Sequence, residues 1–204
     1  MEPIYFDNHL VILEKPAGIA TQPDFHEMAK EWGKNFFSKK GAIFLEPIHR
    51  LDKPASGIVV FAKTTKALKR LNEAMRAGEF EKVYLAIVEG EVEEEGSLTH
   101  YLSHGSFRAH VVDEADPEGK LAHLTYRKKQ TRGGKALVEV QLHTGRYHQI
   151  RAQFGEMGHP IVGDQKYGAR KRQDQIPLHH HKITFSHPVT KEKLTFESQA
   201  AFSL

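Results

Sequence analysis

The chain has 204 residues and a formal net charge of +3, and 39% of its residues are hydrophobic and 27% charged. This is the composition of an ordinary globular protein, with enough chain for one sizeable core or two small ones. No apolar run approaches the roughly 18 to 20 residues of a membrane span, residues 1–7 lack the features of a signal peptide, and without cysteine there is no disulfide, thiolate metal site or cysteine nucleophile. We therefore expect a cytoplasmic protein with no membrane contact.

The first third of the chain predicts short strands around one helix. Residues 4–6 and 10–13 are apolar runs separated by a polar turn, which is typical of two paired strands. A helix is expected over 26–37. The β-branched apolar run at 58–62 predicts a buried strand.

The middle of the chain begins with a second predicted helix. Thr64 or Thr65 can cap its start, and Gly78 closes it. The nearly continuous apolar run at 83–88 predicts a central strand. The stretch 104–120, rich in Gly, Asp and Pro, is expected to be a loop or an irregular hairpin. The other expected elements are strands over 97–102, 121–126 and 136–142, a helix over 146–156, and a closing hairpin over 178–185 and 193–196.

Many strands, few helices and mostly short connections predict an α+β fold. We expect a mixed, largely antiparallel central sheet with flanking helices. The sequence contains no internal repeat, no low-complexity linker and no clear boundary, so we expect one domain over residues 1–204 that acts as a monomer.

The polar stretch from His49 to Gly57 is the most informative in the sequence. It reads His-Arg-Leu-Asp-Lys-Pro-Ala-Ser-Gly and places one carboxylate, Asp52, in a turn-forming loop. A carboxylate held this way can be a nucleophile, a base or a metal ligand. It can equally be an aspartate that only caps the turn, and its position alone leaves both interpretations open.

A second unusual stretch, 144–151, combines two arginines with a polar helix start. Arg146 and Arg151 are five residues apart, so they do not share a helix face well. One of them can therefore face a cleft while the other faces a different partner. The alternative is a solvated helix start with a basic flank.

The sequence lacks the further residues that a kinase site or a metal site would need. The kinase motif that contains His-Arg-Asp needs an asparagine shortly after the aspartate and a later Asp-Phe-Gly, and neither is present. Three of the 14 histidines are adjacent, at 179–181, but neighbouring strand residues point to opposite faces. His-Glu-x-x-His is absent as well. We expect no metal.

Charge is unevenly distributed along the chain. Acidic residues concentrate at 89–95, whereas basic residues cluster at 127–135 and 170–172. Separated clusters of this kind can give a positive face suited to phosphates. For a single cluster, solvated loop charges are the alternative explanation.

Four stretches, in order, resemble the RluA-type pseudouridine synthases. They are Leu10 to Gly18, the His49 to Gly57 loop, Lys82 to Ala86, and Gly145 to Arg151 continuing to Gly168. The tail from Leu178 to Thr190 is similar to the last hairpin of that family. The chain departs from the family at Lys53-Pro54-Ala55 and at Tyr147, where the family usually has threonine.

The resemblance implies isomerisation of a uridine in rRNA or tRNA to pseudouridine, with no cofactor or metal. It implies that Asp52 is the essential carboxylate, that Arg151 keeps it charged and oriented, and that Tyr84 stacks on the uracil and handles the proton at C5. Without the resemblance, Tyr84 would be read as a core residue. The implied substrate-binding residues are His49, Arg50, Arg146 and Ile150.

The target uridine must leave the base stack, and Arg50 is a candidate to fill the vacated space. Ile150 is expected to pack beneath the base. The candidate phosphate contacts are Arg127, Lys128, Lys129, Arg170, Lys171 and Arg172.

Two rival functions are compatible with parts of the sequence. One is a catalytically inactive RNA-binding module of the same fold, against which the intact Asp52, Tyr84 and Arg151 argue. The other is a hydrolase or glycosidase, which normally needs a second carboxylate. Glu14 and Asp164 are the only acids near the motifs, and neither has a clear acid–base setting in the sequence.

Overall fold

The computed structural model describes residues 1–204, which divide into two compact units. The first unit is Met1–Glu81 with His180–Gln199, and the second is Lys82–His179 with Ala200–Leu204. That residues 1–204 form a single domain stays a prediction. None of the helices is long and apolar enough to cross a membrane.

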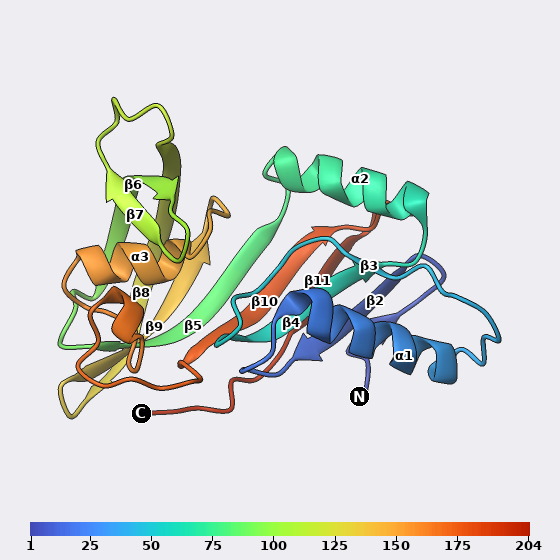
Figure 1. Cartoon of the computed structure of the whole chain (residues 1–204), viewed down its shortest axis with the longest axis horizontal. Coiled ribbons are helices and arrows are strands. Elements are labelled where there is room, and N and C mark those ends of the chain that lie inside the picture. The colour runs from blue at the N-terminus through green and yellow to red at the C-terminus, as the bar shows by residue number, and fades with distance from the viewer. The chain divides into compact units, whose positions relative to one another are not determined.

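The first unit is a sheet with two helices. Its strands follow the order β1, β2, β4, β10, while β3 also pairs with β4 and β11 with β10. The pairs β1–β2, β2–β4, β3–β4 and β10–β11 are antiparallel. The elements are β1 (Tyr5–Phe6), β2 (Leu10–Lys15), α1 (His26–Phe36), β3 (Glu46–Pro47), β4 (Ser56–Ala62), α2 (Thr65–Arg76), β10 (Leu178–Ser186, of which Leu178 and His179 belong to the second unit) and β11 (Lys193–Glu197), with a short helical turn, η1, at Thr21–Phe25 (Figure 1).

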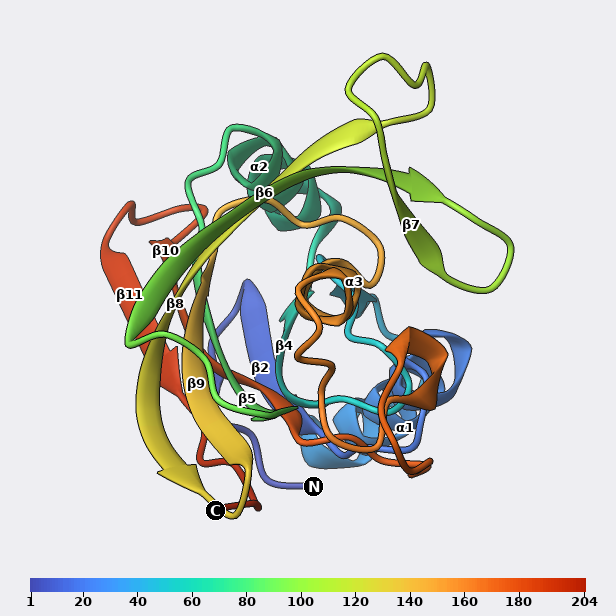
Figure 2. The same ribbon diagram turned by 90° about the vertical axis from the view of Figure 1, so that its left-hand side faces the viewer.

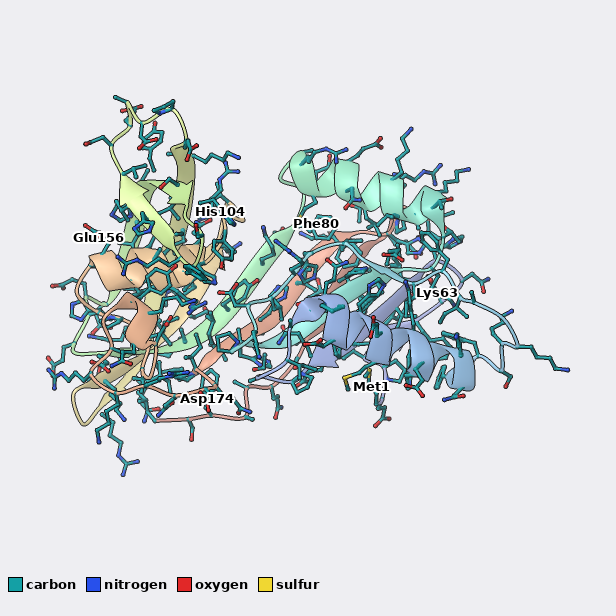
Figure 3. All side chains as sticks on the ribbon, in the orientation of Figure 1. Met1, Lys63, Phe80, His104, Glu156 and Asp174 are labelled. Atoms are coloured by element: carbon teal, nitrogen blue, oxygen red, sulfur yellow. The ribbon has the colours of Figure 1, made fainter.

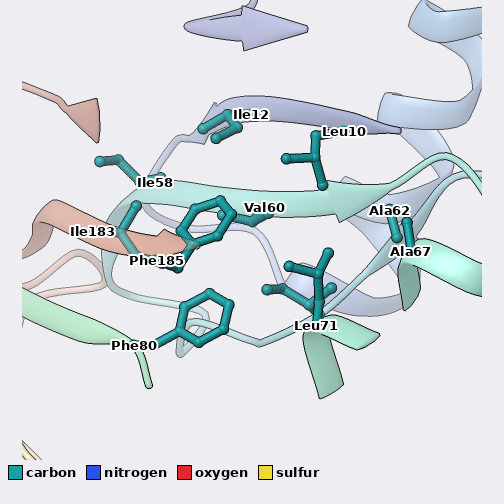
Figure 4. Close-up of a cluster of buried hydrophobic side chains, with 11 residues drawn as sticks. Leu10, Ile12, Ile58, Val60, Ala62, Ala67, Leu71, Phe80, Ile183 and Phe185 are labelled. Carbon is teal, nitrogen blue, oxygen red and sulfur yellow. The ribbon is translucent and has the colours of Figure 1, made fainter. Parts of the chain in front are cut away.

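Helix α2 covers one face of this sheet. Alternate residues of a strand point to the same face, and the residues that β2, β4 and β10 place on this face are apolar. Thr64 caps the helix by accepting a hydrogen bond from the Ala67 amide at 3.1 Å. Phe80 stacks on Phe185 with ring centroids 4.8 Å apart. The labelled members of this core are Leu10, Ile12, Ile58, Val60, Ala62, Ala67, Leu71, Phe80, Ile183 and Phe185 (Figure 4).

The second unit is an antiparallel sheet with one main helix. Its strands follow the order β5, β9, β8, β6, β7, and each neighbouring pair is antiparallel. The elements are β5 (Glu81–Glu89, of which Glu81 belongs to the first unit), β6 (Glu95–His104), β7 (Ala109–Val112), β8 (Lys120–Arg132), β9 (Lys135–Leu142), α3 (Gln149–Glu156) and the short helix η2 (Gln165–Tyr167) (Figure 2).

Two glutamine side chains anchor α3 to the strands of this sheet. Gln153 is fully buried and donates to the carbonyl oxygens of Leu98 on β6 at 3.0 Å and Ala122 on β8 at 3.2 Å. Gln149 donates to the His123 carbonyl oxygen at 3.1 Å. A buried polar group destabilises the fold unless it is hydrogen-bonded, so these bonds specify the helix position.

The structure confirms the predicted α+β fold with a largely antiparallel sheet. The helix expected over 146–156 begins only at Gln149. His148, just before it, has a positive φ of 53°, which a helix does not allow. The Gln149 side-chain oxygen also accepts the Arg146 amide hydrogen at 3.0 Å, so the preceding segment is a capped turn.

The stretch 104–120 contains β7, which pairs with β6 as a hairpin, one of the two forms expected for it. A difference from the prediction concerns the next strand. Strand β8 runs on to Arg132, so the basic residues from Arg127 lie on a strand instead of a loop. A register shift between Lys128 and Gln130 interrupts its pairing with β9.

Candidate active site

The Asp52 loop of the first unit connects β3 to β4 and is tied on both flanks by backbone groups. Leu51 exchanges two hydrogen bonds with the Thr21 hydroxyl, which accepts from its amide and donates to its carbonyl oxygen, each at 2.9 Å. On the other flank, the Gly18 amide donates to the Lys53 carbonyl oxygen at 2.8 Å, and the Ala55 amide donates to the Asp52 carbonyl oxygen at 3.0 Å. The backbone that carries the carboxylate is therefore fixed.

A buried lysine is hydrogen-bonded to the same loop. Lys15 ends β2 and has 0% of its surface exposed. Its ammonium donates to the carbonyl oxygens of Pro16, Ile19 and Ala55 at 2.9, 2.8 and 2.6 Å. An ammonium has three hydrogens, so all are used when it is charged. Burial lowers the pKa of Lys15 to about 8, although attraction to Asp52 opposes that shift.

The glycine that ends this loop permits a close contact between strands. Gly57 has φ +117°, and a Cβ there would lie 2.5 Å from the backbone nitrogen and oxygen of His180 on β10. Only glycine tolerates both conditions. The Ser-Gly of the sequence motif is thus required for the packing of β4 against β10.

His49 and Arg50, both predicted to bind substrate, differ in their surroundings. The Val60 amide donates to His49 Nε2 at 3.2 Å, and the imidazole ring packs edge-on against His180 at 5.3 Å between centroids. His49 therefore supports the loop. Arg50 is exposed beside Asp52, as a residue that reaches toward RNA must be.

In the second unit, Tyr84 lies on β5 and is 8% exposed. It pairs with Val140 on β9, so its backbone position is set by that strand pairing. Ile150, in the first turn of α3, is also buried. Arg146 lies before the helix, is exposed, and donates from Nε to the Leu121 carbonyl oxygen at 2.9 Å.

Arg151 is held by a buried carboxylate and an aromatic ring. Its Nε and Nη2 donate to the two oxygens of Asp164 at 2.6 and 2.9 Å, and both side chains are buried. Its guanidinium lies over the Tyr167 ring at 5.1 Å from the centroid. A bidentate pair of this kind fixes the plane of the guanidinium.

The residues around Arg151 form a stack of rings. Tyr147 stacks on His148 with centroids 3.8 Å apart, and His148 Nδ1 is hydrogen-bonded to the Tyr167 hydroxyl at 2.8 Å. Burial lowers the pKa of His148 to about 3, and the positive charge of Arg151 acts in the same direction. His148 is therefore neutral at physiological pH and adds no charge beside Arg151.

The three adjacent histidines face different groups. His180 Nδ1 is hydrogen-bonded to the Ile58 carbonyl oxygen at 2.8 Å, and His181 Nδ1 to the Ser198 carbonyl oxygen at 2.6 Å. The His179 ring packs edge-on against Phe202. No group of three or more histidine, cysteine, aspartate or glutamate side chains is arranged to hold a metal ion.

Four of the six predicted phosphate contacts form ion pairs within the chain. Lys128 pairs with Glu94 at 2.8 Å and Lys129 with Glu139 at 3.8 Å. Arg170 pairs with Glu89 at 3.7 Å and Arg172 with Asp174 at 3.8 Å. The Lys129–Glu139 and Arg172–Asp174 pairs are exposed on both sides and contribute little stability, whereas Lys128 and Glu89 are each mostly covered.

Sequence reasoning missed Lys15 and the role of Asp164. Lys15 belongs to a stretch that carries the family resemblance, but nothing in the sequence shows that its ammonium is buried. Asp164 was considered only as an acid for a rival hydrolase. Its bidentate bond to Arg151 shows instead that it is a structural partner, and Glu14 accepts a hydrogen bond from the Ser198 hydroxyl at 2.6 Å.

Comparisons with known proteins identify the family of this chain. The family described as RNA pseudouridylate synthase matches residues 9–156. The chain is 31% identical over 207 residues to the uncharacterized RNA pseudouridine synthase YhcT of Bacillus subtilis, covering 97% of this chain and 68% of the relative. It is also 31% identical to the dual-specificity RNA pseudouridine synthase RluA of Haemophilus influenzae, covering 99% and 94%.

A solved structure shows the same fold. Human RNA Pseudouridylate Synthase Domain Containing 4 superposes with a TM-score of 0.83 at 21% identity, covering 97% of this chain and 88% of that one. With the matches in sequence, the chain belongs to the RNA pseudouridylate synthase family, and the RluA-type resemblance is confirmed. It is an RNA pseudouridine synthase, an enzyme that isomerises uridine in RNA.

The buried ammonium of Lys15 predicts a pH-dependent contribution to stability. Its pKa is about 8 in the folded chain and about 10.4 in an unfolded one. Between these values the unfolded chain binds more protons, so raising the pH favours the folded state. We expect the free energy of unfolding of the wild type, relative to Lys15→Met, to rise from pH 8 to pH 10 by about 2 kcal/mol.

Urea unfolding at several pH values measures this difference. Lys66→Met, which replaces an exposed lysine on α2, is the matched control and should show no such trend. A difference between wild type and Lys15→Met that stays constant from pH 8 to pH 10 contradicts the assignment.

Proposed function

We propose that this enzyme converts a specific uridine in structured rRNA or tRNA to pseudouridine with Asp52 as the essential carboxylate. The observation that carries the proposal is the Asp52 loop, whose backbone is fixed by Thr21, Gly18 and the buried Lys15. An aspartate that only caps a turn does not need such a fixed backbone. A catalytic carboxylate needs it, because small errors in its position relative to the substrate slow the reaction.

The reaction is an isomerisation and needs no second substrate. The bond from C1′ to N1 breaks, the uracil turns, and C1′ bonds to C5. The hydrogen on C5 then leaves as a proton, and N1 takes up a proton. Attack at C1′, attack on the base and action at the 2′ position all require Asp52 to act as a carboxylate.

Tyr84 and Arg151 are proposed as the catalytic partners in the second unit. The ring of Tyr84 offers a face for the uracil and its hydroxyl a site for the C5 proton. Arg151 supplies a permanent positive charge for the carboxylate. Support for Arg151 comes from its own fixation by Asp164 and Tyr167, which leaves the guanidinium in one orientation. We assign Ile150 to packing against the base, and His49 and Arg146 to substrate binding.

Replacing Asp52 by asparagine tests the proposal, because asparagine keeps the shape of the side chain and removes the charge. We expect pseudouridine formation to fall to background while RNA affinity stays within a few-fold. Pseudouridine mapping of total RNA from cells with wild type, Asp52→Asn or no protein measures the effect. If no site depends on the protein although it binds RNA, the chain is an inactive binding module. If Asp52→Asn restores every site, the carboxylate is not essential.

Arg50 is proposed to fill the space that the flipped uridine leaves in the RNA stack. Its exposure next to Asp52 supports this role. Unstacking a base costs a few kcal/mol, so Arg50→Ala should slow the reaction on a folded stem–loop by roughly 10-fold or more and change it little on an unstructured strand with the same uridine. Single-turnover rates on the two RNAs give the comparison. Arg76→Ala, at an exposed arginine at the end of α2, is the control. Equal loss on both RNAs rules out the flipping role.

The basic residues at 127–129 and 170–172 are proposed to contact RNA phosphates. Each phosphate contact adds about 0.9 to the slope of log affinity against log salt on duplex nucleic acid. Replacing Arg170, Lys171 and Arg172 by alanine should weaken binding about equally for all RNA sequences and lower that slope by roughly 1 to 3. Replacing Arg127, Lys128 and Lys129 tests the other cluster. An unchanged slope removes that cluster from the interface.

A further inference from the structure

The turn between β6 and β7 presents an exposed aromatic ring. Phe107 is 80% exposed, more than any other large hydrophobic side chain of the protein. A single exposed apolar side chain is common and needs no explanation by itself. This one is distinguished by the rigidity of the turn that carries it.

Four hydrogen bonds hold the turn in place. Within it, the Gly105 amide donates to the Arg108 carbonyl oxygen at 3.0 Å. From η2, Lys166 Nζ donates to the Phe107 carbonyl oxygen at 2.7 Å, and Arg108 donates back to the Lys166 carbonyl oxygen at 3.3 Å. The Ala109 amide, next in the chain, donates to the Tyr167 hydroxyl at 2.8 Å.

The turn also leaves no space for a side chain at its glycine. A Cβ on Gly105 would lie 2.7 Å from the Arg108 carbonyl oxygen and 2.9 Å from the His110 ring. On the other side, a Cβ on Gly155 of α3 would lie 2.8 Å from the Tyr167 carbonyl oxygen. Helix α3, η2 and the turn are therefore closely packed, and Phe107 is displayed from a fixed support.

A second exposed ring lies at the end of β6. His104, labelled in Figure 3, stacks on Tyr147 with centroids 4.3 Å apart, and Tyr147 in turn stacks on His148 at 3.8 Å. His104 is the exposed outer member of this stack, and His148 is the buried inner one. The same end of the β6–β7 hairpin thus carries two exposed rings on ordered supports.

The charge at this end of the hairpin is positive. Arg108 and Lys166, which tie the turn to η2, are both exposed, and so is Arg146, next to Tyr147. The acidic residues of this region lie at 113–118, in the connection that leaves the opposite end of β7. An exposed ring among cations suits a polyanion with aromatic groups and suits an apolar protein surface poorly.

We propose that the β6–β7 turn is a stacking platform for an unpaired base of the RNA substrate. The Phe107 ring stacks on the base, while Arg108 and Lys166 contact the neighbouring phosphates. The inference rests on the proposed function in taking RNA as the partner. It adds a contact to a nucleotide other than the one that reacts, and it makes the platform selective for RNA with an unpaired loop.

The test compares three substitutions of Phe107 in the full chain. Phe107→Ala removes the ring, Phe107→Leu keeps an apolar side chain without an aromatic face, and Phe107→Trp keeps the face. Fluorescence anisotropy at one fixed salt concentration gives the affinity for two labelled RNAs, a stem–loop with an unpaired loop and a blunt duplex of the same length. Phe44→Ala, at another exposed phenylalanine, is the control.

Loss of one stacked base weakens binding by roughly 5- to 150-fold. We expect that loss on the stem–loop for Phe107→Ala and Phe107→Leu, near wild-type binding for Phe107→Trp and Phe44→Ala, and no change on the duplex. The inference is overturned if the wild type does not prefer the stem–loop, if Phe107→Leu binds like the wild type, or if Phe44→Ala is as weak as Phe107→Ala.

The outcome separates this inference from the proposed function. If the wild type makes pseudouridine and Phe107→Ala binds the stem–loop normally, the platform is rejected and the enzyme assignment stands. If Phe107→Ala loses affinity but the wild type makes no pseudouridine at any site, the platform stands and the assignment fails.

Discussion

A lysine ammonium buried without contact to water is the constraint on which the Asp52 loop depends. Such a charge is tolerated only where hydrogen bonds replace its hydration. The carbonyl oxygens of Pro16, Ile19 and Ala55 must converge on Lys15 to supply those bonds, and this convergence joins the end of β2 and the segment after it to Ala55 of the loop. The order of the loop therefore follows from the need to satisfy one side chain, and Asp52 receives a positive neighbour in addition.

The second unit also contains a buried positive charge, but a carboxylate compensates it there in place of carbonyl oxygens. Arg151 is buried against a carboxylate, and Asp164 takes two of its five donors in one plane. A lysine at the same position would form a point contact and could rotate about it. The ring of Tyr167 closes one face of the guanidinium, and His148 beside it stays uncharged because it is buried. The orientation of the Arg151 guanidinium and the charge around it are thus set by the same few residues.

The parts of the structure that local patterns encode could be predicted from the sequence. Alternating and continuous apolar runs gave the positions of β4 and β5, and Thr64 marked the start of α2 through its capping side chain. The start of α3 was missed because Gln149 satisfies the Arg146 amide with its side chain, and no periodicity reveals that bond. Strand β7 was predicted only as part of a loop or an irregular hairpin, because it is short and lies among turn-forming residues.

In the candidate site, too, some residues could be predicted from the sequence, whereas other contacts could be identified only from the three-dimensional structure. The motif around Asp52 was recognisable because its residue types are unusual together. The pairing of Arg151 with Asp164 was not, because thirteen residues of chain separate them and an aspartate after a glycine has many possible roles. The partner of a buried charge can lie far away in the sequence and is brought close to it only when the chain folds. Such a partner is therefore identified from the structure.

The departures of this chain from its family can be explained by the way the loop is held. At Lys53 and Ala55 the loop is fixed through backbone carbonyl oxygens, which accept from the Gly18 amide and from Lys15. Any residue has a carbonyl oxygen, so the exposed side chain of Lys53 and the half-buried one of Pro54 can change without loosening the loop that carries Asp52, whereas Ala55 is buried and leaves room only for a small side chain. Tyr147 behaves in the same way, since its ring stacks outside the Arg151–Asp164 pair. A scaffold fixed by backbone and buried charge leaves the exposed side chains around it free to diverge, and these are the side chains that an RNA would meet.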